Sequence, residues 1–174
     1  MNGYAIQFMN IELIPAKVED AKIVFDSWGK NANNFKYLSA TPQQNVNDAS
    51  NYLKNALTGN NSVFHIIDST SGSIVGLIKA KVEGHKALIG YVVDESFWGR
   101  GIATIAVKKL VEILNGNEAI ERIWAACATN NLASAKVLEK SGFKKEGIFK
   151  KWIVYPAQGN QSHDNFVFVW QKDA

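Results

Sequence analysis

The run from Phe97 to Thr104 constrains the fold of this chain more than any other part of its sequence. It follows a strand-like stretch over 87–93 and opens a helix-like stretch over 102–114. Its G-x-G-x-A spacing lets the backbone turn tightly and bring N–H groups close to a ligand. A helix start also carries unpaired N–H groups, and Arg100 adds a fixed positive charge. The run predicts a phosphate-binding connection, with a ligand-free tight turn as the plainer alternative.

Composition limits the class of protein. With 174 residues, 47% of them hydrophobic and 20% charged, the chain is predicted to be a single globular domain, 1–174. A net charge of +3 without a basic cluster gives no case for nucleic-acid binding, and no apolar run is long enough to span a membrane. One cysteine and no signal-peptide pattern lead us to expect a cytoplasmic protein.

Hydrophobic periodicity predicts an α/β chain in which strands and helices are mixed. A helix over 18–28 has acidic residues in its first turn, and a second helix is expected to open at Thr41 and Pro42. A loop is expected over 158–164. The remaining predicted helices cover 102–114 and 132–140, and the predicted strands cover 5–14, 63–67, 74–82, 87–93, 122–128, 148–155 and 165–171.

A second motif, NLASAKVLEKSGF from Asn131 to Phe143, follows the glycine-containing loop at a fixed distance. Together the two motifs resemble the GNAT N-acetyltransferases, and most closely their Rim-type branch, which acetylates ribosomal-protein N-termini. The order of predicted elements is also similar, over about residues 8 to 171. A P-loop is excluded because no Gly-Lys-Ser/Thr follows, and a Rossmann motif fits poorly because antiparallel-looking strands come first.

The resemblance implies a GNAT fold, with a central, mostly antiparallel sheet of about seven strands flanked by four helices. It also implies acetyl-coenzyme A as cosubstrate and no metal. Tyr91 and Val93 would hold the pantetheine arm through backbone groups, and Asn131 would bond to the same arm. The residues expected to cradle the pyrophosphate are Gly99, Arg100, Gly101, Ile102, Ala103 and Thr104.

The resemblance identifies the catalytic groups less completely than the groups that bind the cosubstrate. Many GNAT enzymes use a tyrosine on the fourth helix as the acid for the leaving thiolate, but the matching residue here is Leu138. Ser134 lies one helical turn earlier and is the expected catalytic acid, although capping or packing is the alternative role for its hydroxyl. Cys127 is expected to be a small core residue. Each of four candidate bases has the alternative role of a solvated surface charge. They are Glu83, His85, Asp94 and Glu95.

The expected function is transfer of an acetyl group from acetyl-CoA to a primary amine, on a protein N-terminus or a small molecule. A coenzyme-binding sensor without turnover is the main alternative, and a structural domain without coenzyme is a third. Aromatic residues of the N-terminal region, mostly packing residues, are expected to form one wall of the acceptor groove: Trp28, Phe35, Tyr37 and Tyr52. An edge strand near the C-terminus could support a homodimer.

Overall fold

The computed structural model describes residues 10–171, which form one seven-stranded sheet in the order β1-β2-β3-β4-β5-β7-β6. Neighbouring strands are antiparallel except for β4 and β5, which are parallel. The mostly antiparallel mixed sheet predicted from the sequence is therefore confirmed. The strands are β1 (Ile11–Pro15), β2 (Asn61–Asp68), β3 (Ser73–Glu83), β4 (Lys86–Val93), β5 (Arg122–Ala128), β6 (Lys144–Val154) and β7 (Ser162–Gln171).

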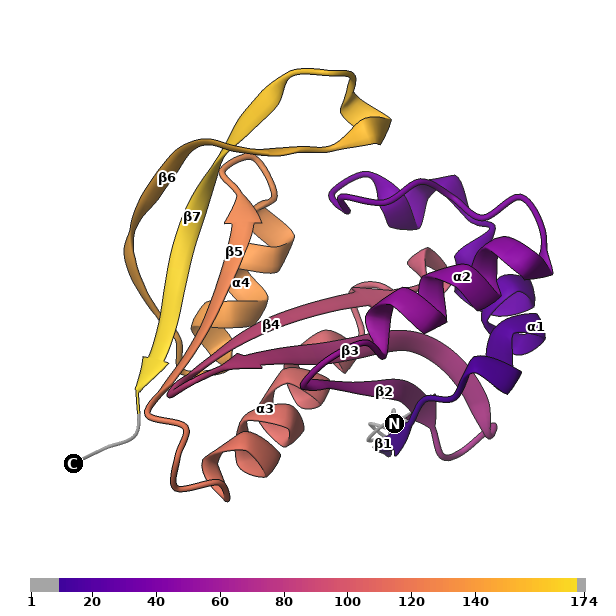
Figure 1. The fold of residues 1–174 in the computed structure, drawn as a ribbon, viewed down its shortest axis with the longest axis horizontal. Helices are drawn as coiled ribbons and strands as arrows, with labels where there is room; N and C mark the ends of the chain where they lie inside the picture. Colours follow the sequence, from indigo (N-terminus) through magenta and orange to yellow (C-terminus); the bar gives the residue numbers. More distant parts are fainter. Residues whose placement is uncertain (1–9, 172–174) are drawn as a thin grey trace, which may run out of the picture.

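Helices cover both faces of the sheet (Figure 1). On one face, α3 (Ile102–Asn115) and α4 (Leu132–Lys140) pack through an apolar stripe that includes Leu110 and Leu138, both buried. On the other face, α1 (Ala21–Val24) and α2 (Val46–Ala56) form a second core around Trp28 and Leu53. The sheet thus separates two apolar clusters, each built from side chains of one strand face and the helices above it.

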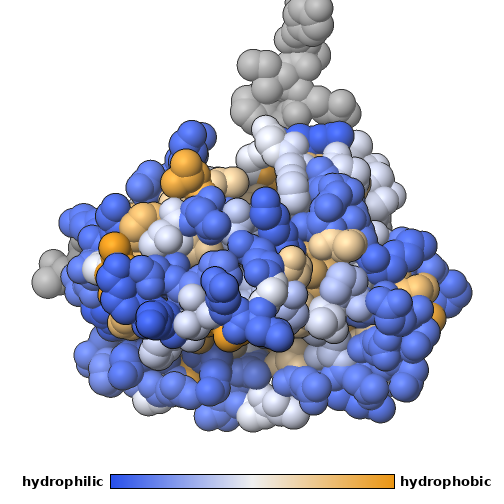
Figure 2. Space-filling model, turned by 90° about the horizontal axis from the view of Figure 1, so that it is seen from above, coloured by the Kyte–Doolittle hydropathy of each residue, from blue (hydrophilic) through white to orange (hydrophobic). Residues whose placement is uncertain are grey.

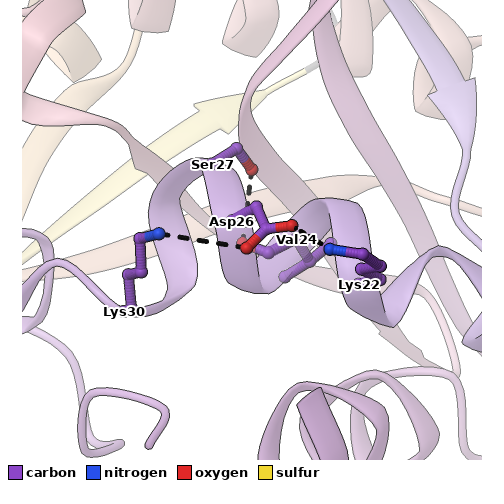
Figure 3. Close-up of polar contacts among 5 residues, drawn as sticks. All are labelled: Lys22, Val24, Asp26, Ser27 and Lys30. Carbon is purple, nitrogen blue, oxygen red and sulfur yellow. Dashed lines mark hydrogen bonds and ion pairs between the residues drawn. The ribbon is translucent and has the colours of Figure 1, made fainter. Parts of the chain in front are cut away.

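The first helical region is irregular where the sequence predicts one helix. A 3-10 turn, η1 (Val18–Asp20), leads into α1, and a π-helical segment, η2 (Phe25–Gly29), follows. Its solvent side carries Asp26, whose carboxylate lies 2.6 Å from the Lys22 ammonium and 3.9 Å from that of Lys30 (Figure 3). Its buried side carries Trp28, which stacks with Phe35 of the 3-10 helix η3 (Ala32–Phe35).

Three predicted element starts are wrong, those of α2, β6 and β7. Helix α2 begins at Val46 rather than at Thr41 and Pro42, because the Asn45 side chain accepts a bond from the Asp48 N–H at 3.0 Å and caps the helix there. Strand β6 begins at Lys144 rather than at residue 148, and β7 begins at Ser162, inside the predicted loop. The first predicted strand, 5–14, lies partly outside the described residues; within them, β1 continues through Pro15.

Candidate active site

Strands β4 and β5 separate shortly after they begin, which opens the sheet at its centre. Their pairing covers only Lys86 with Arg122, Ala87 with Ile123, and Leu88 with Trp124. Beyond these pairs the two strands diverge toward their C-terminal ends (Figure 1). Each strand keeps its other neighbour, because β4 pairs with β3 up to Val93 and β5 pairs with β7 up to Ala128. The facing edges of β4 and β5 therefore carry backbone groups without a strand partner.

Backbone direction along β4 identifies the groups that face this opening. The Asp94 N–H donates to the Val75 carbonyl of β3 at 2.9 Å, so Asp94 points toward β3. Because successive residues of a strand point their backbone groups to opposite edges, those of Val93 and Tyr91 point toward β5. The Trp98 indole N–H donates to the Val93 carbonyl at 2.7 Å, which leaves the Val93 N–H as the free group at the end of β4.

The glycine-containing loop begins after the 3-10 turn η4 (Glu95–Phe97) and ends at the start of α3. Gly99 and Gly101 have φ angles of 77° and 79°, a left-handed conformation that glycine adopts without steric cost. A Cβ added at either glycine would meet no atom within 4 Å, so the space above the loop is open. Both glycines therefore serve backbone conformation and access rather than side-chain packing.

The start of α3 presents free N–H groups next to this open space. The first helical bond runs from the Ile105 N–H to the Gly101 carbonyl at 3.1 Å, so the N–H groups of Ile102, Ala103 and Thr104 precede it. The Ile102 side chain is buried in the core, and only its backbone is available to a ligand. Arg100 is exposed and donates to the Ser96 carbonyl at 3.0 Å. This arrangement can hold an anion at a helix N-terminus.

A buried carboxylate connects the end of β4 to the N-terminal region. Asp94 is 8% exposed and accepts bonds from Asn34 Nδ2 at 2.8 Å and from the Ser96 N–H at 3.1 Å. Burial alone would raise the pKa of Asp94, but its hydrogen bonds with Ser96, Asn34 and Asn31 lower it below its usual range. Glu95 in turn accepts from Asn31 at 2.8 Å. The segment around η3 is thereby fixed against the loop that precedes α3.

Ser134 on α4 contacts the side chain of a tyrosine from β4. The Tyr91 hydroxyl lies 2.8 Å from Ser134 Oγ and 3.3 Å from the Ser134 carbonyl oxygen. Asn131 caps α4, its side-chain oxygen accepting the Ser134 N–H at 3.2 Å, so the helix start fixes where Ser134 lies. Sequence reasoning placed Tyr91 here only for its backbone. Its contact with Ser134 joins residues 43 apart in the chain, which no local pattern reveals.

Burial sets the protonation of the groups around Ser134. It raises the pKa of the Tyr91 phenol above its usual value, although the hydrogen bond with Ser134 opposes this shift. Burial also raises the pKa of the Cys127 thiol to about 11, again opposed by hydrogen bonding with Ser134. Both groups are therefore protonated at neutral pH. Cys127 is 5% exposed, which confirms the prediction of a core residue. Leu138, at the position of the absent tyrosine, is 1% exposed and packs in the core.

The candidate bases divide into two groups. Glu83 and His85 flank the β3–β4 turn, at the opposite end of β4 from Val93, and Glu83 pairs with Lys81. The length of β4 separates them from the Val93 end of the opening, so neither can reach an acceptor there. Asp94 and Glu95 lie at the correct end, but both carboxylates are engaged by asparagine side chains. Within 10–171, no three histidine, cysteine or acidic side chains group as metal ligands would.

Two segments far apart in sequence meet beyond the C-terminal end of β5. The Tyr37 ring packs edge-on against that of Tyr155, with centroids 6.1 Å apart, and the Tyr37 hydroxyl donates to the Asn130 carbonyl at 3.4 Å. Gln158 donates to the Lys36 carbonyl at 2.7 Å. Seen from above, the molecular surface is mainly hydrophilic, with apolar residues in small separate groups (Figure 2). Tyr155 and Gln158 lie in a stretch where the sequence offered no motif.

Trp28 and Phe35 are fully buried, which confirms their predicted packing role, whereas Tyr37 and Tyr52 are half-buried. Among residues 10–171, no helix is long and apolar enough to cross a membrane.

Comparison with known proteins identifies the family of this chain. The family model described as "Acetyltransferase (GNAT) domain" matches residues 10–144, which include β4, the loop before α3, α3 itself and α4. The chain belongs to the GNAT acetyltransferase family. The GNAT fold is also seen in solved structures: an acetyltransferase from Bacillus anthracis shares 23% identity at a TM-score of 0.79, covering 95% of this chain and 98% of that one. A RimL acetyltransferase in complex with coenzyme A has a TM-score of 0.83 at 22% identity, covering 94% and 95%.

The curated relatives of this GNAT protein are N-acetyltransferases. An uncharacterized N-acetyltransferase p20 of Bacillus licheniformis is 28% identical over 143 residues, covering 78% of this chain and 80% of that protein. The [ribosomal protein uS5]-alanine N-acetyltransferase of Escherichia coli is 26% identical over 99 residues, covering 55% and 51%. The match to this enzyme supports the predicted Rim-type branch. The chain is thus an N-acetyltransferase by family.

Proposed function

We propose that this protein transfers the acetyl group of acetyl-CoA to a primary amine, either a protein N-terminal amine or a small-molecule amine. The observation that carries the proposal is the opening between β4 and β5, which ends at the free Val93 N–H and adjoins the loop before α3. An extended chain can add to a free strand edge through backbone hydrogen bonds, as the pantetheine arm would here. RimL in complex with coenzyme A and MccE in complex with acetyl-CoA and AMP share the fold.

In this proposal the cosubstrate is held at its two ends. The N–H groups of Gly99 to Thr104 and the Arg100 side chain bind the pyrophosphate at the start of α3. Backbone groups of Tyr91 and Val93 hold the pantetheine arm, and the Val93 N–H donates to the thioester oxygen as negative charge develops there. Asn131, fixed as the cap of α4, lies beside the same arm.

Transfer needs a proton for the departing sulfur. As the C–N bond forms and the C–S bond breaks, the thiolate takes a proton from Ser134, whose oxygen lies 2.8 Å from the Tyr91 hydroxyl. Ser134 regains a proton from the water that has taken the proton of the amine, so the serine acts as a relay. A thiol has a pKa of about 8.5, so a hydroxyl is a weak acid for it and depends on positioning. Tyr91, kept protonated by burial, orients the serine and supports its developing charge. In this proposal, Tyr91 from β4 provides the tyrosine that α4 lacks, because α4 carries Leu138 at the position where many GNAT enzymes have one.

The amine must lose a proton, and its own pKa decides how much help it needs. An α-amine with a pKa of about 8 is roughly one-tenth neutral at pH 7, whereas a lysine with a pKa of about 10.4 is neutral in under a thousandth of molecules. Deprotonating the lysine costs about 3 kcal/mol more. Because Asp94 and Glu95 are already hydrogen-bonded, we propose water as the proton acceptor. This favours α-amines over lysine side chains as acceptors.

The test is acetyl-CoA turnover, followed as thiol release, across a panel of peptides and small amines, with mass spectrometry to locate the acetyl group. Acetylation of an α-amine, with the lysine side chain of the same peptide unmodified, supports the proposal. Saturable acetyl-CoA binding without thiol release across the panel would instead favour the coenzyme-binding sensor, for which the buried Leu138 is the supporting observation. Absence of both binding and turnover would refute the coenzyme site itself.

A further inference from the structure

The sheet face below α2 carries a partly buried lysine, Lys79, on β3. The same face bears the exposed Lys81 and Lys86 and the partly buried Arg122. Lys81 pairs with Glu83 at 2.5 Å, and Arg122 pairs with Glu146. Within residues 10–171, Lys79 forms no ion pair; its ammonium lies 6.0 Å from the centroid of the Tyr52 ring. A lysine is rarely buried without an acidic partner, so an anion bound at Lys79 would offset the cost of burying its charge.

The surroundings of Lys79 confirm that its charge is poorly solvated. Burial lowers the pKa of Lys79, and it raises the pKa of the neighbouring Tyr52 phenol to about 12. Tyr52 is therefore neutral at physiological pH and cannot serve as the counter-ion. Its ring offers only a weak attraction for the ammonium at this distance.

Register places Lys79 at the mouth of the opening between β4 and β5. It pairs with Gly90, the second residue of β4 beyond the last pair with β5, Leu88–Trp124. A Cβ added to Gly90 would lie 3.9 Å from Lys79 Cε, so the lysine stem leans across β4 over the missing side chain. A hollow lined by Lys81, Leu88 and Trp124 adjoins this position on the same face.

This face is the one left to the acceptor if the proposed function holds. The loop before α3 and helix α4 would hold the cosubstrate from the other face, so the amine must approach over Gly90 and Val93 from the side of α2. Val93 follows Gly90 by three steps along β4, a distance of about 10 Å at about 3.3 Å per residue. An anion held by Lys79 therefore lies about that far from the reacting amine.

We propose that Lys79 binds a carboxylate of the acceptor and so selects polypeptides with an acidic side chain at the second or third residue. This inference rests on the proposed acetyltransferase function. An extended peptide covers about 10 Å in three residues, which matches the separation between Lys79 and the end of β4. A free α-amino acid carries its amine and carboxylate on one carbon and cannot span it. The interaction is an ammonium–carboxylate ion pair formed at a lysine that is partly shielded from water.

The experiment compares peptides that share one sequence and differ only in Glu, Gln or Lys at residue two or three, in series beginning with Ala, Ser, Gly or Met. For the wild type we expect kcat/KM to be about tenfold higher with Glu than with Gln, mostly through a lower KM. This factor corresponds to the contribution of one charged hydrogen bond. Lys79→Met should lose this preference while acetylating the Gln peptide at the wild-type rate, which also shows that the variant is folded.

Three further variants sharpen the result. Lys79→Arg should keep the preference for Glu, and Lys79→Glu should reverse it toward the Lys peptide. Lys81→Met, on the same strand and the same face, is the matched control and should keep it. Equal preferences in wild type and Lys79→Met would overturn the proposal, as would a Lys79→Met loss of kcat shared by all peptides.

Failure of the inference is separable from failure of the enzyme. If no peptide is acetylated, equilibrium binding of the Glu and Gln peptides in the presence of coenzyme A still tests Lys79 in wild type and Lys79→Met. Tighter binding of the Glu peptide that disappears in Lys79→Met supports the inference without turnover. Indistinguishable binding of the two peptides by the wild type would refute it, even for an active acetyltransferase.

Discussion

Removal of the Tyr91 hydroxyl is the perturbation that most sharply separates a catalytic Ser134 from a merely structural one. Tyr91→Phe deletes one atom that lies 2.8 Å from Ser134 Oγ and keeps the ring and the backbone of β4. A hydrogen bond between two neutral buried groups contributes about 1 kcal/mol to stability, and one to a group that gains charge contributes about 1.5 to 3 kcal/mol. The difference, about 0.5 to 2 kcal/mol, is the part of this interaction that stabilises only the transition state.

That difference corresponds to a fall in kcat of about 2- to 30-fold for Tyr91→Phe. The KM for acetyl-CoA should stay within about twofold, because the backbone contacts assigned to Tyr91 survive. Ser134→Ala should lower kcat further, and the double variant should be no slower than Ser134→Ala alone, since the tyrosine acts through the serine. Steady-state thiol release at saturating acceptor measures all three.

Ser141→Ala is the matched control for these losses. Ser141 lies at the end of α4, is buried, and donates to the Val137 carbonyl at 2.8 Å, so its removal tests the loss of a helix hydroxyl without touching the opening. Its kcat should equal that of the wild type. Losses in Tyr91→Phe and Ser134→Ala that multiply in the double variant would refute the proposed relay, and an unchanged kcat in Ser134→Ala would remove the serine from the acid role.

Three further outcomes follow from the loop and its supports. Gly101→Ala should lower the free energy of unfolding by about 1 to 2 kcal/mol in urea titration, because its φ of 79° is strained for alanine although the space is open. Arg100→Ala should raise the KM for acetyl-CoA about fivefold at unchanged kcat, the value of an exposed ion pair. Asp94→Asn should lower stability by about 1 to 3 kcal/mol at pH 7. Since the Asp94 pKa is lowered on folding, that loss should shrink below about pH 4; a pH-independent loss would contradict this.

Local signals in the sequence were sufficient wherever an element is defined by its own residues. The helix predicted over 132–140 is Leu132–Lys140 in the structure, because Asn131 caps it and Gly142, with a φ of 89°, follows its end. The loop before α3 was predicted for the same reason. Its glycines lie between a strand and a helix, where the spacing predicted a tight turn, and both adopt a left-handed conformation.

Elements shaped by distant contacts were predicted less completely. A strand was predicted over 148–155, but β6 begins at Lys144, because its first residues are exposed and are held by pairing with β7 rather than marked by alternating burial. The helix predicted over 18–28 becomes π-helical over Phe25–Gly29, and Gln43 packs against its end. The Gln43 N–H donates to the Gly29 carbonyl at 2.9 Å, and the Gln43 side chain fills the space of the missing Cβ. Gln43 follows Gly29 by 14 residues, so no local pattern predicts this contact.

The same distinction holds for the candidate site. The resemblance identified Ser134 and noted that Leu138 stands where a tyrosine is usual, and both positions were assigned from one helix. That β4 supplies Tyr91 to the same place, and that Lys79 leans over Gly90 without a counter-ion, depends on how strands lie beside each other. Such relations become visible only once the register of the sheet is known.

A crystal structure of the protein with acetyl-CoA tests the central claim most directly. The pantetheine arm is expected between the diverging ends of β4 and β5, with the Val93 N–H near the thioester oxygen and Ser134 Oγ near the sulfur. The pyrophosphate is expected on the N–H groups of Gly99 to Thr104 at the start of α3. Acetyl-CoA bound elsewhere, or in this opening with its sulfur far from Ser134, would contradict the account.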